Sequence, residues 1–148
     1  MIGVSLGACS ATRVCTLLGC TAAATLDVIV VDDPAQLVGA TLQVCRNSRC
    51  AVGPIPMVPP SPGSMVAALS GDIYAVVEVS AVAGMQGARV TADVFQADDL
   101  ANGDVYTFSL RSSDGTVLAS RTSTATYVEE YPNGPDCGPP CLAAHLSP

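Results

Sequence analysis

The feature that most limits how this chain can fold is the alternation of apolar and polar residues along short segments. In residues 104–110, Tyr106, Phe108 and Leu110 fall on one side of an extended chain, and polar residues fall between them. Residues 89–95 repeat this period of two, which is typical of half-buried β-strands. We predict strands over residues 25–31, 40–46, 49–55, 73–80, 89–95, 104–110, 116–121, 124–131 and, last and shortest, 141–146.

Turn-forming residues separate these segments. Ser113-Asp114-Gly115 and Asn102-Gly103 tolerate the backbone angles of tight turns, and residues 46–49 form the expected tip of a hairpin. The Pro-rich residues 54–63 offer too few backbone donors for a sheet and are predicted to form an edge or crossover loop. Helical periodicity is nearly absent, and only residues 64–69 suggest a single helical turn.

Composition and chain length limit the architecture further. Hydrophobic residues make up 49% of the 148 residues, whereas aromatic residues make up 4% and Trp is absent. We therefore predict one all-β domain, an antiparallel β-sandwich of about seven to nine strands with an Ig-like architecture and a core of small aliphatic residues. Residues 1–8 are expected to be an apolar N-terminal segment, residues 9–24 a cysteine-containing linker, and residues 25–148 the sandwich.

Seven cysteines divide into one plus six. The six form three close pairs in the sequence, Cys15 with Cys20, Cys45 with Cys50, and Cys137 with Cys141. Cys45 and Cys50 would be cross-strand neighbours in a hairpin, and a bond between Cys137 and Cys141 would close a Pro-Gly turn. Cys15 and Cys20 would either bond each other or each bond one member of the Cys137/Cys141 pair, because six cysteines allow 15 connectivities.

Paired cysteines also indicate where the protein resides. Disulfides persist in oxidising compartments, so we expect an exported protein. A zinc site is disfavoured because structural zinc sites favour C-x2-C pairs, which are missing here. No apolar run is long enough to predict a transmembrane helix.

The remaining cysteine, Cys9, follows the short apolar string Leu6-Gly7-Ala8. This string resembles the lipobox of bacterial lipoproteins, which implies a lipid attached to Cys9 and a membrane as its partner. The competing interpretation is an ordinary apolar segment with a chance match, since Leu17–Cys20 fits the same pattern loosely.

These cysteine motifs, together with the segment Pro132–Cys141, resemble the small exported β-sandwich lipoproteins of high-GC bacteria. All six basic residues are Arg and Lys is absent, which is consistent with high-GC coding. The resemblance implies a location at the cell envelope and a sandwich architecture, and it implies no activity.

Candidate catalytic residues are few, and we expect a non-enzymatic protein without a cofactor. His145 is the single histidine, no Gly-x-Ser-x-Gly elbow occurs, and paired cysteines cannot act as nucleophiles. The best candidate ligand site is a weak calcium site formed by Asp98, Asp99, Asn102 and Asp104. Such a composition also suits a hairpin turn, and we favour the turn.

Charge and aromatic content decide among binding functions. The net charge of −7 and the absence of Lys exclude nucleic acid as a partner. A glycan-binding surface would need exposed aromatic rings, for which Tyr127 and Tyr131 are the candidates, whereas Tyr106 is predicted to be in the core. We expect a structural or protein-interaction module that binds an envelope or extracellular protein. The alternatives are a calcium- or glycan-binding module and a self-assembling, oligomeric extracellular subunit.

Overall fold

The fold is all-β, as predicted. A computed structural model describes residues 15, 18–60, 62–82 and 87–147. These residues form one short 3-10 helix, Pro34–Leu37, and nine strands. The strands are β1 Ala24–Val31, β2 Thr41–Arg46, β3 Arg49–Pro54, β4 Ser64–Gly71, β5 Ala75–Ala81, β6 Ala88–Val94, β7 Val105–Arg111, β8 Val117–Glu130 and β9 Cys141–Ser147. No helix among the described residues is long and apolar enough to span a membrane.

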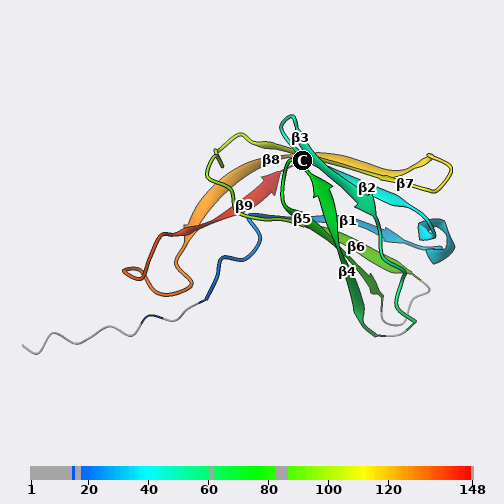
Figure 1. Ribbon diagram of the computed structural model, residues 1–148, viewed down its shortest axis with the longest axis horizontal. Helices are drawn as coiled ribbons and strands as arrows, with labels where there is room; N and C mark the ends of the chain where they lie inside the picture. Colours follow the sequence, from blue (N-terminus) through cyan, green and yellow to red (C-terminus); the bar gives the residue numbers. More distant parts are fainter. Residues whose placement is uncertain (1–14, 16–17, 61, 83–86, 148) are drawn as a thin grey trace, which may run out of the picture.

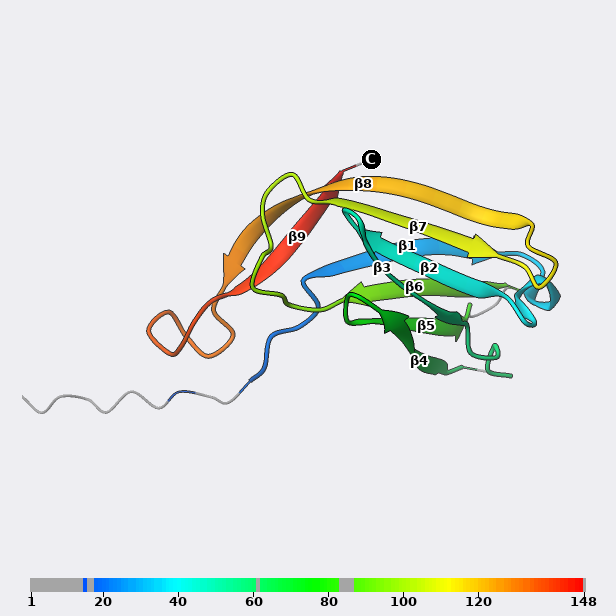
Figure 2. The same ribbon diagram turned by 45° about the horizontal axis from the view of Figure 1, so that its top comes forward.

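All strand pairs are antiparallel, and the strands form one sheet in the order β1-β6-β5-β4-β3-β2-β7-β8-β9. The sheet curls until its first and last strands approach each other, so that it resembles a nearly closed barrel (Figures 1 and 2). The backbone N–H of Ala144 donates to the carbonyl of Ala23 across this seam, over 2.7 Å. The fold differs from the expected Ig-like sandwich because β3 pairs with β4 and joins the two halves into one sheet.

The core lies inside the curled sheet and follows the predicted alternation. Leu42 and Val44 of β2 are fully buried, Leu110 and Phe108 of β7 are buried opposite them, and Tyr106 is buried opposite Arg46. Burying each large aliphatic or aromatic side chain contributes about 1.5–3 kcal/mol relative to leaving it exposed. The prediction that Tyr106 belongs to the core is confirmed.

The disulfides only partly match the sequence-based expectations. Cys45 and Cys50 bond across the β2–β3 hairpin, as predicted. The expected local bond between Cys137 and Cys141 was wrong, because Cys15 bonds Cys137 and Cys20 bonds Cys141. The alternative that had been left open, in which the two cysteine pairs bond each other, is the observed one.

The physical reason is that the chain before β1 lies beside the turn between β8 and β9. The side chain of Asn133 accepts a hydrogen bond from the Leu18 N–H over 2.7 Å and donates one to the Leu18 carbonyl over 2.9 Å. This places the two cysteine pairs side by side. Residues 15 and 20, which fall in the expected linker, are thus covalently bound to the domain.

Two secondary-structure predictions were wrong, one in the type of element and one in the length of a strand. Residues 64–69, the suggested helical turn, belong to strand β4, because pairing with β5 from Ser64 to Leu69 outweighs local preference. The predicted strands 116–121 and 124–131 are one continuous strand, β8, because β7 pairs with its first half and β9 with its second. The predicted turn at residues 113–115 is confirmed, with Gly115 at φ 88°.

The junction of β3 and β4 depends on a close backbone approach. Only two residue pairs join these strands, Ala51 with Gly71 and Val52 with Ser70. A Cβ atom at position 71 would lie 2.1 Å from the carbonyl oxygen of Cys50. Glycine is therefore required where the two halves of the sheet meet.

We expect Gly71→Ala to lower the free energy of unfolding by about 1–3 kcal/mol, because the methyl group would force the two strands apart. Denaturant titration would measure the change. Gly19→Ala is the matched control, since a Cβ at Gly19 contacts nothing within 4 Å. Equal stability of the Gly71→Ala variant and the wild type would contradict this description of the junction.

Candidate functional site

Two of the acidic residues predicted as a calcium site, Asp99 and Asp104, lie beside a buried arginine. Arg46 ends β2 on the inward face, and only 1% of it is exposed. Its Nη2 lies 2.5 Å from Asp99 Oδ1, and its Nε lies 3.9 Å from Asp104 Oδ2. Asp99 also forms an ion pair with Arg49. A buried guanidinium needs such partners, because an unpaired buried charge is strongly destabilising.

Asp104 links this arginine to the strands around it. Its carboxylate accepts hydrogen bonds from the Asn47 side chain over 2.8 Å, the Tyr127 hydroxyl over 2.9 Å and the Ala101 N–H over 3.2 Å. Burial alone would raise the pKa of Asp104, but these hydrogen bonds and the charge of Arg46 outweigh burial and hold the pKa below its usual value. Asp104 therefore stays ionised inside the fold.

Two tyrosines complete the network. The hydroxyls of Tyr106 and Tyr127 lie 2.6 Å apart. Burial raises the pKa of both tyrosines, and the hydrogen bonds to Tyr106 and Asp104 raise the pKa of Tyr127 further. Both hydroxyls remain protonated at neutral pH. The network connects β2, β7 and β8 with the loop that precedes β7.

Of the four predicted calcium ligands, Asp99 and Asp104 are ion-paired with Arg46, and the other two do not contact it. The side-chain oxygen of Asn102 accepts a hydrogen bond from the Tyr127 N–H over 2.7 Å. Asp98 is exposed and has no hydrogen bond or ion pair within the described segments. Across residues 15, 18–60, 62–82 and 87–147, no group of three or more His, Cys, Asp or Glu side chains could hold a metal ion. Calcium binding here stays a prediction.

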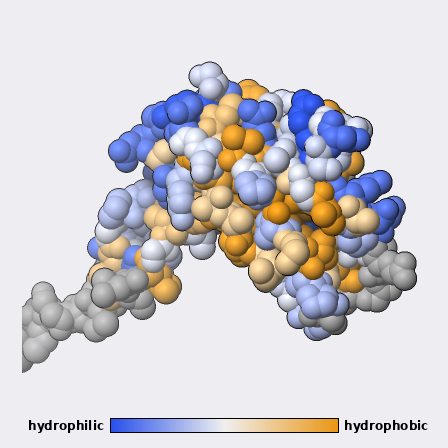
Figure 3. Space-filling model, turned by 45° about the vertical axis from the view of Figure 1, so that its right-hand side comes forward, coloured by the Kyte–Doolittle hydropathy of each residue, from blue (hydrophilic) through white to orange (hydrophobic). Residues whose placement is uncertain are grey.

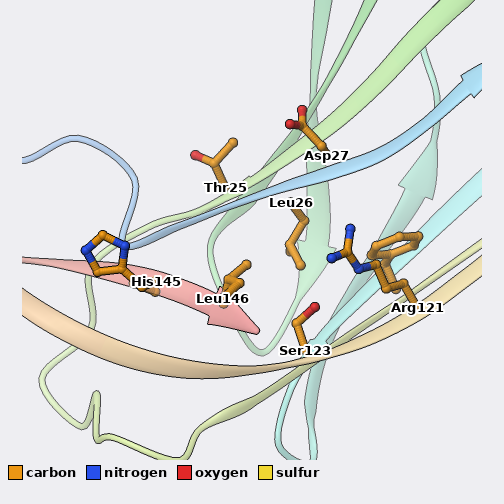
Figure 4. Close-up of a pocket in the computed structure, with 9 residues that line it drawn as sticks. Thr25, Leu26, Asp27, Arg121, Ser123, His145 and Leu146 are labelled. Carbon is orange, nitrogen blue, oxygen red and sulfur yellow. The ribbon is translucent and has the colours of Figure 1, made fainter. Parts of the chain in front are cut away.

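A pocket of about 280 Å³ lies at the seam where β1 and the last two strands part. Its lining comes from β1, β7, β8 and β9, and consists of Thr25, Leu26, Asp27, Phe108, Arg121, Ser123, Ala144, His145 and Leu146. Figure 4 shows Arg121 and Ser123 directed into the space between β1 and β8, with Leu26 and Leu146 beside them. The lining thus combines the Arg121 guanidinium, the hydroxyls of Thr25 and Ser123, the Asp27 carboxylate and His145 with four apolar side chains.

The other residues singled out from the sequence are dispersed. His145 is exposed on β9 opposite Thr126, at the rim of the seam pocket. Tyr131 is exposed and donates its hydroxyl hydrogen bond to Glu129 over 2.7 Å, while Tyr127 is half-buried in the Arg46 network. The candidate glycan-binding rings are therefore not arranged as one platform. Cys9, the predicted lipid-attachment residue, lies outside the described residues.

Strand β4 presents an exposed apolar edge. Met65 and Val66 are both exposed, with 59% of Val66 accessible, and β4 contains no charged residue. Its residues from Ser64 to Leu69 pair with β5 on one side, whereas its pairing with β3 is confined to Ser70 and Gly71. Figure 1 shows β3 and β4 meeting near the end of β4 and parting toward its start. Apolar residues occupy much of the middle of the face seen in Figure 3.

Sequence reasoning missed the two arginines on which these sites depend. Arg46 follows Leu42 and Val44 at every second position, so the period of two already indicated an inward-pointing charge. Arg121 lies on the same face of β8 as the buried Ser123 and Ala125, but the split of β8 into two predicted strands obscured this. In both cases the usable signal was a charged residue in the same alternation as buried neighbours, although Arg46 is buried and Arg121 is exposed.

Asp104→Asn should lower the free energy of unfolding by about 2 kcal/mol at pH 6, because it removes the negative charge beside buried Arg46. A carboxyl whose pKa is lowered by folding stabilises the fold above its unfolded pKa, near 4, and loses that contribution as the pH falls through the folded pKa. The difference between variant and wild type should therefore shrink below about pH 4.

Urea titrations between about pH 2 and 6 would measure this dependence. Asp98→Asn is the matched control, because Asp98 belongs to the same acidic segment and has no partner within the described residues. Two results would contradict a stabilising role for Asp104. One is an equal loss of unfolding free energy in the two variants, and the other is a difference between Asp104→Asn and the wild type that does not change with pH.

Comparison with known proteins adds no relative. No protein-family model matches the chain, and neither the curated proteins nor the solved structures gave a match.

Proposed function

We propose that the protein is an exported, non-enzymatic β-domain that is held at the cell envelope through an acylated Cys9 and binds a partner protein. Three disulfides support export, because such bonds form and persist in oxidising compartments. The lipobox-like string before Cys9 supports lipid attachment. The binding role rests on a separate observation, the unpaired edge of β4.

That edge is the single observation that carries the interaction function. Six residues, Ser64–Leu69, have a strand partner on one side only. On the other side, Gly53 of β3 lies beside Ala68 and Leu69, whereas the backbone N–H and C=O groups of Ser64–Ala67 are available to an extended segment of another chain. Edge strands are commonly protected from such pairing by Lys, Pro or a covering element, and β4 contains neither a charge nor a proline.

The chemistry of β4 indicates what kind of partner would fit. Its exposed side chains are small or apolar, with Ser64, Met65, Val66 and Ala68 all exposed. An added strand of alternating apolar residues would cover these side chains while its backbone completes the hydrogen bonding. A different protein is favoured over a second copy, because two copies that each carry a net charge of −7 repel each other.

Site-specific photo-crosslinking in the native envelope would test this proposal. A photoreactive residue at position 66 of β4 should yield an adduct with an envelope or extracellular protein. The matched control is position 128, an exposed valine on β8 that pairs with Ala143. Val66→Lys should abolish partner binding by placing a charge on the edge, and it should be tolerated because Glu78 lies opposite.

The same adducts from positions 66 and 128, or no adduct from position 66, would rule out β4 as the docking edge. Partner binding that persists in the Val66→Lys variant would also rule out β4 as the docking edge. The melting temperature of this variant would show that the domain is still folded.

Membrane attachment has its own test. The natively expressed protein should lack residues 1–8, carry an acyl group on Cys9 and gain about 6 Da when its three disulfides are reduced. Cys9→Ser should move the protein from the membrane fraction to the soluble fraction. An unmodified chain that begins at Met1 would contradict lipid anchoring, whatever the outcome at β4.

A further inference from the structure

We propose that the seam pocket binds a small monocarboxylate with a short apolar chain, and that Arg121 binds its carboxylate. The pocket is lined by β1, β7, β8 and β9, so this inference does not depend on partner binding at β4. It rests on an exposed arginine that has no partner within the described residues, on the buried Ser123 hydroxyl on the same face of β8, and on the apolar side chains in the lining of the pocket.

Arg121 differs from the other arginines that the structure describes. Arg46 and Arg49 form ion pairs with Asp99, Arg89 pairs with Asp27, and Arg111 donates to the carbonyl of Gly115. Within residues 15, 18–60, 62–82 and 87–147, Arg121 has no ion pair and no hydrogen bond. In a chain with 13 acidic residues and 6 basic ones, this cation is free for an external anion.

The position of Arg121 directs its charge into the pocket. It lies opposite Phe108 of β7 and on the same face of β8 as Ser123 and Ala125, which are buried. Figure 4 shows its guanidinium pointing into the space below β1. A guanidinium binds a carboxylate through two parallel hydrogen bonds, which suits a small planar anion better than a neutral ligand.

The neighbouring groups favour a carboxylate joined to an apolar chain. Ser123 is only 2% exposed, and its hydroxyl has no hydrogen bond in the described part of the chain, so it is available as a donor to the same anion. Leu26 and Phe108, which are almost fully buried, and the half-buried Leu146 supply the apolar part of the lining. The volume of about 280 Å³ falls just below the range of sites for drug-sized molecules, which indicates a ligand of a few carbons.

The one carboxylate in the lining does not neutralise this charge. Asp27 forms its ion pair with Arg89, with 3.2 Å between Oδ2 and Nη2. In Figure 4, Asp27 and Thr25 point away from the space that Arg121 and Ser123 enter. The Thr25 hydroxyl donates to Asp93 over 2.6 Å. The interior of the pocket is therefore positive although the chain as a whole is acidic.

Titration of the isotopically labelled full chain with hexanoate, followed by amide NMR, would test the assignment. We expect saturable binding below about 10 mM, with shifts concentrated at Leu26, Ser123 and Leu146. Hexan-1-ol has the same chain without the charge and should bind at least about tenfold more weakly. Inorganic phosphate has charge without a chain and should likewise bind at least about tenfold more weakly.

Variants separate the role of Arg121 from general charge effects. Arg121→Gln should weaken hexanoate binding by about tenfold or more, whereas Arg111→Gln, outside the pocket, should leave it unchanged. The wild-type titration needs no variant, so the proposal remains testable even if Arg121→Gln fails to fold. Absence of saturable binding by the wild type, equal binding of hexan-1-ol or of phosphate, or unchanged binding in a folded Arg121→Gln variant would overturn the proposal.

Discussion

The covalent connection between the start of the domain and the β8–β9 turn is the constraint on which the rest of the structure depends. Cys15–Cys137 and Cys20–Cys141 join residues 122 and 121 positions apart. Closing one loop of that length reduces the entropy of the unfolded chain by an amount worth about 5 kcal/mol. Beside these bonds, the N–H of Ala144 donates to the carbonyl of Ala23 across the seam. The bonds hold β1 near β9, and the seam pocket lies where the two strands part.

Two arginines that alternate with buried residues differ in their burial and in their partners. Arg46 lies deep in the fold and is surrounded by Asp99, Asp104 and their hydrogen-bond donors, so its charge contributes to rigidity. Arg121 lies at the seam pocket, is exposed and has no such partner within the described residues. The same residue type is thus a paired, buried charge at the end of β2 and an unpaired, exposed charge on β8.

Much of the fold could be predicted from the sequence, because the period of two and the turn residues are local signals. The β2–β3 hairpin and its disulfide followed from Cys45, Cys50 and the tip between them. Strand β4 was missed because its pairing with β5, rather than its own composition, determines its conformation. The seam disulfides and the Arg121 pocket arise from contacts between distant segments, which no local pattern specifies.

Disulfide mapping of the unreduced protein, by proteolysis and mass spectrometry, tests the central claim most directly. The account predicts covalent linkage between the peptide containing Cys15 and Cys20 and the peptide containing Cys137 and Cys141, with Cys45 bonded to Cys50. Reduction should release the two terminal peptides from each other. Separate terminal peptides, each closed by its own local disulfide, would contradict the two disulfides that hold β1 near β9. Such a result would also remove the basis for the pocket between these strands.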